Sequence, residues 1–107
     1  MITIHKFKLK PGNVTAKECD EILEIEGLLH ILHAGLDGEG RLCVWALRHT
    51  ESGHKKRVKI LVRGTGHDCS DVLMAGEGGV EFAHLGSVQQ GLYMWHVFAL
   101  TGEAIDQ

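Results

Sequence analysis

A tight-turn signal, Asp37-Gly38-Glu39-Gly40, separates two strongly apolar segments, residues 28–36 and 41–49. Glycine adopts the positive φ values of tight turns at low cost, so this spacing predicts a β-hairpin. In the second segment apolar side chains fall on both parities, which is typical of a strand covered on both faces. The sequence therefore predicts a central strand at residues 41–49, in a sheet that needs cover on each side.

Two segments near the start of the chain show further strand patterns. Residues 2–9 alternate apolar and polar side chains, and the break between Ile4 and Phe7 indicates a bulge. Residues 21–26 fit a strand and, nearly as well, a helix, because their apolar side chains satisfy both spacings. We favour the strand and leave the helix open.

The second half of the chain predicts three more strands. Residues 55–63 place valine and isoleucine on one face and mainly cations on the other. Residues 80–88 and 92–100 flank the turn Gln89-Gln90-Gly91 and should pair with each other. Between them, residues 70–75 predict one short helix capped by Ser70.

These patterns predict an all-β fold, or an α+β fold if the short helix forms. A length of 107 residues suits a single core, and neither a repeat nor a Gly/Ser-rich or Pro-rich linker divides it. We therefore expect one domain over residues 1–107, built as an antiparallel β-sandwich or a partly closed barrel of six to seven strands.

Charge and cysteine usage limit the class of protein. The formal net charge is −3, which excludes a generally basic nucleic-acid coat, and all 11 Lys and Arg lie in residues 6–17 and 41–63. Three widely spaced cysteines suit reduced thiols better than a disulfide framework. No apolar run approaches the roughly 20 residues of a membrane span, so we expect no membrane partner and a cytoplasmic location.

Four motifs carry a family resemblance: Leu42-Cys43-Val44-Trp45-Ala46-Leu47, Gly64-Thr65-Gly66-His67, Leu85-Gly86-Ser87-Val88 and Trp95-His96-Val97-Phe98. With them, roughly residues 21–100 resemble a group of small all-β proteins encoded by phages and their bacterial hosts. This resemblance, the small size and the missing catalytic constellation favour a non-enzymatic binding protein in the host cytoplasm that interferes with a host process or defence system. Its partner would be a host protein or a phosphorylated nucleotide signal.

A candidate site for an anionic partner follows from the predicted strand at residues 55–63. Alternate residues of a strand project from one face about 7 Å apart, so its cations can act together beside the glycine-rich turn that ends the strand. Arg48 is expected to join them from the neighbouring strand. The expected ligand-binding residues are Arg48, Arg57, Lys59, Arg63, Gly64, Thr65, Gly66 and His67.

Two other functions remain open as alternatives. The basic strand suits nucleic-acid binding, although the seven cations of residues 41–63 are offset by an acidic remainder. His67 and Cys69, with His84 or His96, have the side chains that zinc prefers in a small hydrolase.

The other expectations concern catalysis, metals and assembly. No nucleophile motif is present, and His30 and His33 should face opposite sides of a strand, so we expect neither an enzyme nor a cofactor or metal. Strand edges without proline need protection, and we therefore expect a homodimer or larger homo-oligomer.

Overall fold

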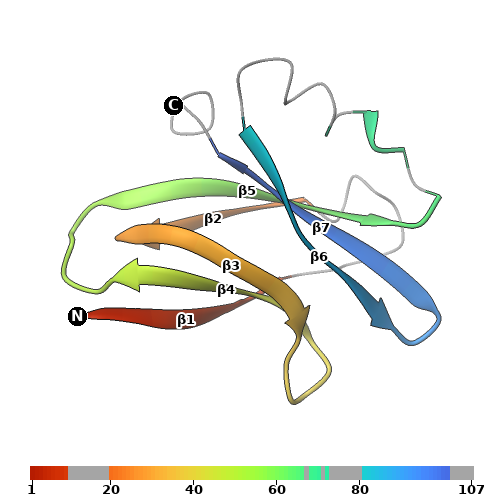
Figure 1. Cartoon of the computed structure of the whole chain (residues 1–107), viewed down its shortest axis with the longest axis horizontal. Coiled ribbons are helices and arrows are strands. Elements are labelled where there is room, and N and C mark those ends of the chain that lie inside the picture. The colour runs from red at the N-terminus through yellow and green to blue at the C-terminus, as the bar shows by residue number, and fades with distance from the viewer. Residues whose placement is uncertain (10–19, 67, 71, 73–80, 102–107) are drawn as a thin grey trace.

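The computed structural model describes residues 1–9, 20–66, 68–70, 72 and 81–101, and these form a two-layered β-sandwich (Figure 1). The all-β prediction is confirmed. The strands are β1 (Ile2–Lys8), β2 (Glu21–Glu26), β3 (Leu28–Leu36), β4 (Leu42–His49), β5 (Lys55–Gly64), β6 (Glu81–Gln90) and β7 (Tyr93–Thr101).

The strands divide into two antiparallel sheets. The first has the order β1-β4-β3 and the second the order β2-β5-β7-β6. As predicted, β4 is a central strand, it pairs with β3 across the hairpin, and β6 pairs with β7. At one open side of the sandwich the edge strands β3 and β6 lie against each other, so this side joins the two sheets (Figure 1).

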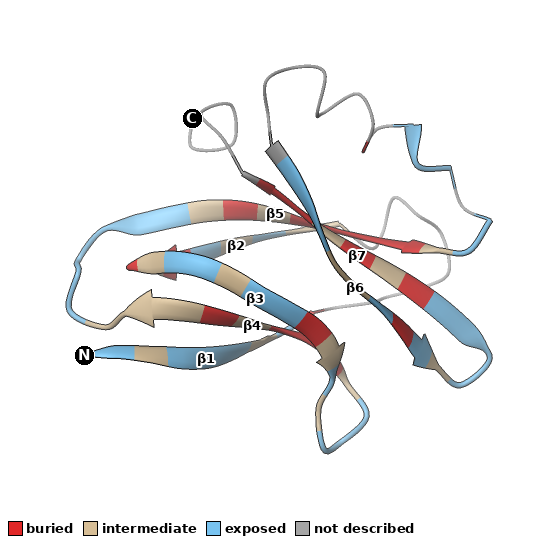
Figure 2. Ribbon diagram, viewed as in Figure 1, coloured by how far each residue is buried: buried red, intermediate tan, exposed pale blue. Residues whose placement is uncertain are grey.

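The main core lies between the sheets. Figure 2 shows buried positions gathered along β4, β5 and β7, which are the inner strands of their sheets. Val44 of β4 and Ile60 of β5 are fully buried there, and Trp95 of β7 is 4% exposed. Full burial of such a side chain stabilises the fold by about 1.5–3 kcal/mol, so a few of them decide whether a domain of this size folds.

The β3–β4 hairpin is closed by the side chain of Asp37. Its Oδ1 accepts hydrogen bonds from the backbone N–H groups of Glu39 and Arg41, both at 2.9 Å. Its Oδ2 accepts one from Lys6 Nζ of β1 at 3.0 Å. These bonds, led by the Arg41 N–H, hold the pKa of Asp37 well below its usual range against the opposing effect of burial. The aspartate that signalled a turn therefore also ties β1 to the hairpin.

Bulges change which face several side chains occupy. Register shifts lie between Leu28 and His30 and between Ile31 and His33 of β3. His30 and His33 consequently pair with Leu47 and Trp45, which share one face of β4. The expectation that the two histidines face opposite sides of a strand is wrong, because an extra residue resets the alternation.

The bulge expected in the first strand is absent. The pairing of β1 with β4 runs without a shift from Ile2 opposite His49 to Lys8 opposite Cys43. Ile2 and Ile4 lie exposed on the face turned away from the second sheet, whereas Phe7 packs against the main core. The broken apolar pattern therefore reflects an edge strand with apolar residues on both faces.

The short helix begins at Ser70, the first residue of the expected range, but Ser70 does not cap it. Ser70 is already helical, and its N–H donates to Asp68 Oδ1 at 3.0 Å. Asp68 therefore occupies the capping role expected of Ser70, and the Ser70 hydroxyl and N–H lower the pKa of this carboxyl. Residues 71 and 73–75 of the expected helix lie outside the described residues. No helix in the described part of the chain is long and apolar enough to cross a membrane.

Candidate functional site

The cations expected to act together on β5 do lie on one face of that strand. Val58, Ile60 and Val62 are buried in the main core, which places Arg57, Lys59 and Arg63 on the opposite face. That face is not an open basic row, however. Leu61 packs with Val72 and Leu100 in a second buried cluster, which separates Lys59 from Arg63.

Arg63 is buried at 2% exposure and is engaged by an acidic partner. Its Nη1 and Nη2 contact the two carboxylate oxygens of Asp20, and Nη1 also donates to the carbonyl of Val62 at 3.1 Å. A guanidinium bound in this way already has the bidentate partner that an anionic ligand would supply. Arg63 therefore has a structural role in this arrangement, and it does not present a free donor surface.

The acidic strand β2 compensates the other end of β5. In the antiparallel pairing Glu24 lies opposite Arg57 and Glu26 lies opposite Lys55. Arg57 Nε is 3.9 Å from Glu24 Oε1. Opposite charges in directly opposed positions stabilise a strand pair. The basic and acidic segments that are distant in the sequence are therefore neighbours, with Arg57 and Lys55 opposite acids and Lys56 and Lys59 opposite isoleucines.

Arg48 lies in the first sheet, because β4 is not a neighbour of β5. Arg48 therefore does not lie on the β5 face, where it was expected. Its Nε donates to the Glu26 carbonyl at 2.8 Å, and its Nη1 lies 2.8 Å from His5 Nδ1, which accepts that hydrogen bond. Arg48 thus ties β1 and β4 to β2 across the other open side of the sandwich. The groove there has a volume of about 380 Å³ and carries mixed charge, including Glu24, Glu26 and Lys55.

The glycine-rich turn after β5 forms as predicted. Thr65 donates its N–H to the Met94 carbonyl at 3.2 Å, and Gly66 has a φ of +93° with open space around it. Gly64 closes β5 and is half-buried. His67, the last expected ligand residue, lies outside the described residues.

A chain of hydroxyl and imidazole groups begins at this turn. Thr65 Oγ1 lies 2.8 Å from His96 Nε2, and His96 Nδ1 lies 2.8 Å from Ser87 Oγ. Ser87 Oγ in turn lies 3.1 Å from His84 Nε2. Sequence reasoning named both histidines as zinc ligands but missed Ser87, because the bulge between His84 and Gly86 that gathers them is not visible in the pattern.

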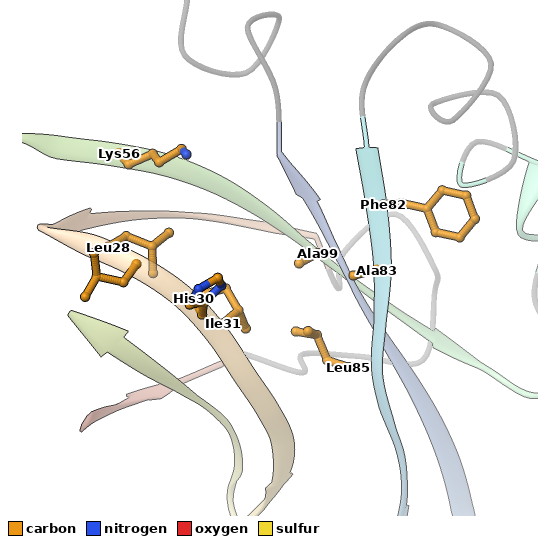
Figure 3. Close-up of a pocket in the computed structure, with 9 residues that line it drawn as sticks. Leu28, His30, Ile31, Lys56, Phe82, Ala83, Leu85 and Ala99 are labelled. Carbon is orange, nitrogen blue, oxygen red and sulfur yellow. The ribbon is translucent and has the colours of Figure 1, made fainter. Parts of the chain in front are cut away.

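A pocket of about 250 Å³ opens between the edge strands β3 and β6 (Figure 3). Leu28 and Ile31 of β3 and Ala83 and Leu85 of β6 come from the two sides of this opening. The remaining lining residues are Leu29, His30, Lys56, Phe82 and Ala99. Most of its lining residues are apolar, but about half of the exposed lining is polar, and two side chains, Lys56 and His30, can carry positive charge.

Lys56 reaches this pocket because it shares the parity of Val58 and Ile60 on the inner face of β5. In the described residues neither Lys56 nor His30 has a side-chain hydrogen bond or ion pair. Strand alternation could have placed Lys56 on the inner face of β5, because Lys56 continues the spacing of the buried Val58 and Ile60. The position of β6 beside β3 could not be predicted from the sequence.

The zinc alternative is not decided by the described residues. No three His, Cys, Asp or Glu side chains gather as a metal site in the part of the chain that the structure describes, and His67 lies outside that part. Cys69 is exposed, whereas Cys43 is buried, and burial raises the pKa of the Cys43 thiol. Zinc binding by His67 and Cys69 therefore stays a prediction.

Comparison with known proteins places the chain in one family. Residues 1–107 match the family model described as "Domain of unknown function (DUF7352)". The match covers the whole sequence, so the chain belongs to this family. No curated protein and no solved structure matches it.

Proposed function

We propose that this member of the DUF7352 family is a non-enzymatic binding protein that holds a small phosphorylated nucleotide in the pocket between β3 and β6. The observation that carries the proposal is the position of Lys56, a cation without a partner in the described residues, beside apolar walls. Ligand sites typically combine such walls with a few polar groups that fix orientation. The ligand is the anionic one expected from the sequence, but its proposed site is the pocket between β3 and β6 instead of the outer face of β5.

The size of the pocket supports a ring with a charged group attached. An apolar cavity of about 150 Å³ holds benzene, so a volume of about 250 Å³ accommodates a bicyclic base. Leu28, Ile31 and Leu85 would contact the faces of that ring. The phosphate would then lie toward solvent at Lys56 and His30, where hydrogen bonds to an ionised group are stronger than neutral ones.

The pairing of the three arginines that were expected at the site supports the same choice. Arg63 is bound to Asp20, Arg57 lies beside Glu24, and Arg48 is held by β2 and His5. A phosphate at any of these would have to displace an existing partner, which costs free energy. At Lys56 it would add an interaction. Sequestration of a nucleotide signal in this way is a phage-type role that needs no catalytic residue.

The proposal is tested by equilibrium binding of a mononucleotide, a cyclic nucleotide and the uncharged nucleoside, followed by calorimetry. We expect the nucleotides to bind more tightly than the nucleoside and the difference to shrink as salt rises. Lys56→Gln should weaken nucleotide binding about tenfold, since a hydrogen bond to a charged group contributes about 1.5–3 kcal/mol when intact and solvent reduces this at an open site.

Two variants locate the site. Lys55→Gln removes a neighbouring cation that lies outside the pocket, opposite Glu26, and should leave affinity unchanged. Ala83→Phe fills the pocket from an exposed position on β6 and should abolish binding without disturbing the core. Absence of nucleotide binding, or binding that ignores both Lys56→Gln and Ala83→Phe, would reject this site. Equal losses in Lys55→Gln and Lys56→Gln would indicate a general charge effect instead.

A further inference from the structure

We propose that His84 and His96 form a binding site for a divalent transition-metal ion, of the Zn²⁺ or Ni²⁺ type, on the outer face of β6 and β7. The site is separate from the pocket of the proposed function, which lies on the side of β6 that meets β3. The proposal starts from the convergence of two imidazole nitrogens on one atom. His96 Nδ1 is 2.8 Å and His84 Nε2 is 3.1 Å from Ser87 Oγ.

The fold brings these groups together through one irregularity. Ser87 and His96 are directly opposed in the antiparallel pairing of β6 and β7. His84 lies three residues before Ser87, so regular alternation would place it on the other face. The register shift between His84 and Gly86 restores it to the face of Ser87. Two histidines on adjacent strands therefore present nitrogens to the same point.

Thr65 can stabilise the tautomer of His96 that a metal ion requires. Its Oγ1 lies 2.8 Å from His96 Nε2, where it can accept that N–H. A neutral imidazole that donates from Nε2 carries its lone pair on Nδ1, which points to Ser87 and His84. Metal-binding histidines commonly donate their second N–H to such an oxygen, which orients the ring. The hydroxyl of Thr65 thus gives His96 a hydrogen bond at the ring nitrogen that faces away from the metal, as is typical of a metal-binding histidine.

The neighbouring groups leave this point accessible and do not oppose a cation. Ser87, His84 and Thr65 are exposed. Arg63 lies opposite His96, but its charge is paired with Asp20. The ring of Phe98 packs against His84 with centroids 5.4 Å apart and restricts its motion from the opposite strand.

The geometry needs only a small adjustment to hold an ion. Zinc–nitrogen bonds are about 2.0–2.1 Å long, so each imidazole must approach the point now occupied by Ser87 Oγ by about 1 Å. Rotation of the Ser87 hydroxyl away from that point vacates it. Two nitrogens leave further coordination positions for water or an added ligand, so the ion would be exchangeable. Imidazole suits Zn²⁺, Ni²⁺ and Cu²⁺ and discriminates against Mg²⁺ and Ca²⁺.

The test is calorimetric titration of the untagged protein with zinc chloride, with magnesium chloride as the ion that should not bind. We expect one zinc ion per chain at this site. His84→Gln and His96→Gln should each lower its affinity at least tenfold, and Thr65→Val should lower it about tenfold by releasing the His96 ring.

Ser87→Ala is the matched control, because it breaks the same hydrogen-bond chain but keeps both imidazoles. A metal site predicts that this variant binds zinc at least as well as the original protein. If the hydrogen-bond chain has only a structural role, Ser87→Ala should lower the melting temperature, and neither the original protein nor the variant should bind zinc at this site. His54→Gln, an exposed histidine remote from this face, should leave zinc binding intact. No zinc binding, or zinc binding that survives both His84→Gln and His96→Gln, would overturn the proposal.

Discussion

Gly27, which links β2 to β3, is the position where a single methyl group should damage the fold most clearly. It has a φ of +67°, and a Cβ placed on it would lie 2.0 Å from the backbone oxygen of His49. Its own N–H donates to the His54 carbonyl at 2.7 Å, and its carbonyl accepts the His49 N–H at 2.8 Å. Gly27→Ala therefore introduces a strained backbone angle and forces apart a buried junction between the sheets.

The cost of Gly27→Ala has two separable parts. The left-handed conformation costs an alanine about 1–2 kcal/mol relative to its ordinary conformations. The contact with His49 cannot be relieved by a side-chain rotation, because the obstructing atom is backbone. Moving it lengthens the two hydrogen bonds of Gly27, each with a net value of about 0.5–1.5 kcal/mol. The free energy of unfolding should fall by about 2–5 kcal/mol, a large part of the stability of a small domain.

Urea unfolding followed by tryptophan fluorescence measures this loss, and Gly91→Ala provides the matched control. Gly91 has nearly the same φ, +60°, but its Cβ would meet no atom within 4 Å. This control should therefore lose only the conformational part, and the difference between the two variants isolates the backbone contact. Equal losses for Gly27→Ala and Gly91→Ala would refute the close packing of the β2–β3 junction against His49.

Three further outcomes follow from contacts in the fold. The hydrogen bonds to Asp37 lower the pKa of its carboxyl group, so this carboxylate contributes stability that is present at neutral pH and lost as the pH falls below about 4. The urea midpoint of Asp37→Asn should therefore vary less with pH in the acid range than that of the original protein. Asp20→Asn should cost about 3 kcal/mol in urea unfolding because it leaves the buried Arg63 charge without its carboxylate, whereas an unchanged midpoint would show that solvent already screens this pair. We also expect a homodimer, which sedimentation equilibrium at micromolar concentration measures, and Ile4→Lys should dissociate it if the exposed apolar face of β1 forms the interface.

Much of the fold was predictable because strand alternation and turn chemistry are local. The Asp37-Gly38-Glu39-Gly40 turn fixed the β3–β4 hairpin, and the two-sided apolar pattern of residues 42–47 indicated that β4 is central. Bulges were not predictable in the same way. A bulge depends on the partner strand and on the side chains that pack against it, so the register shifts in β3 and β6 could not be seen in the alternation of their residues. The break in the apolar pattern of β1 indicated a bulge that is absent.

The candidate site depended on pairings that the sequence does not contain. The alternation of residues 55–63 correctly placed Arg57, Lys59 and Arg63 on one face, but whether that face is open depends on the strand beside it. The strand beside it is β2, in which Glu24 lies opposite Arg57. Asp20, just before β2, engages Arg63, and the outer cluster at Leu61 separates Arg63 from Lys59. A charge pattern in the sequence therefore located a strand face and left its partner undetermined.

The two open sides of the sandwich differ in how the cations Arg48 and Lys56 are held, and this difference bears on where the proposed ligand would bind. At the β1–β2 side Arg48 spans the gap and is held by the Glu26 carbonyl and by His5, so the arginine beside the groove of about 380 Å³ already has partners within the chain. At the β3–β6 side Gly86 allows the strands to approach, since a Cβ there would lie 3.1 Å from the Ala34 carbonyl. The small side chains Ala83 and Ala99 then leave a hollow beside Lys56. An anion with an apolar body would add an interaction at Lys56, whereas at Arg48 it would compete with partners within the chain, and for this reason we place the proposed ligand on the β3–β6 side.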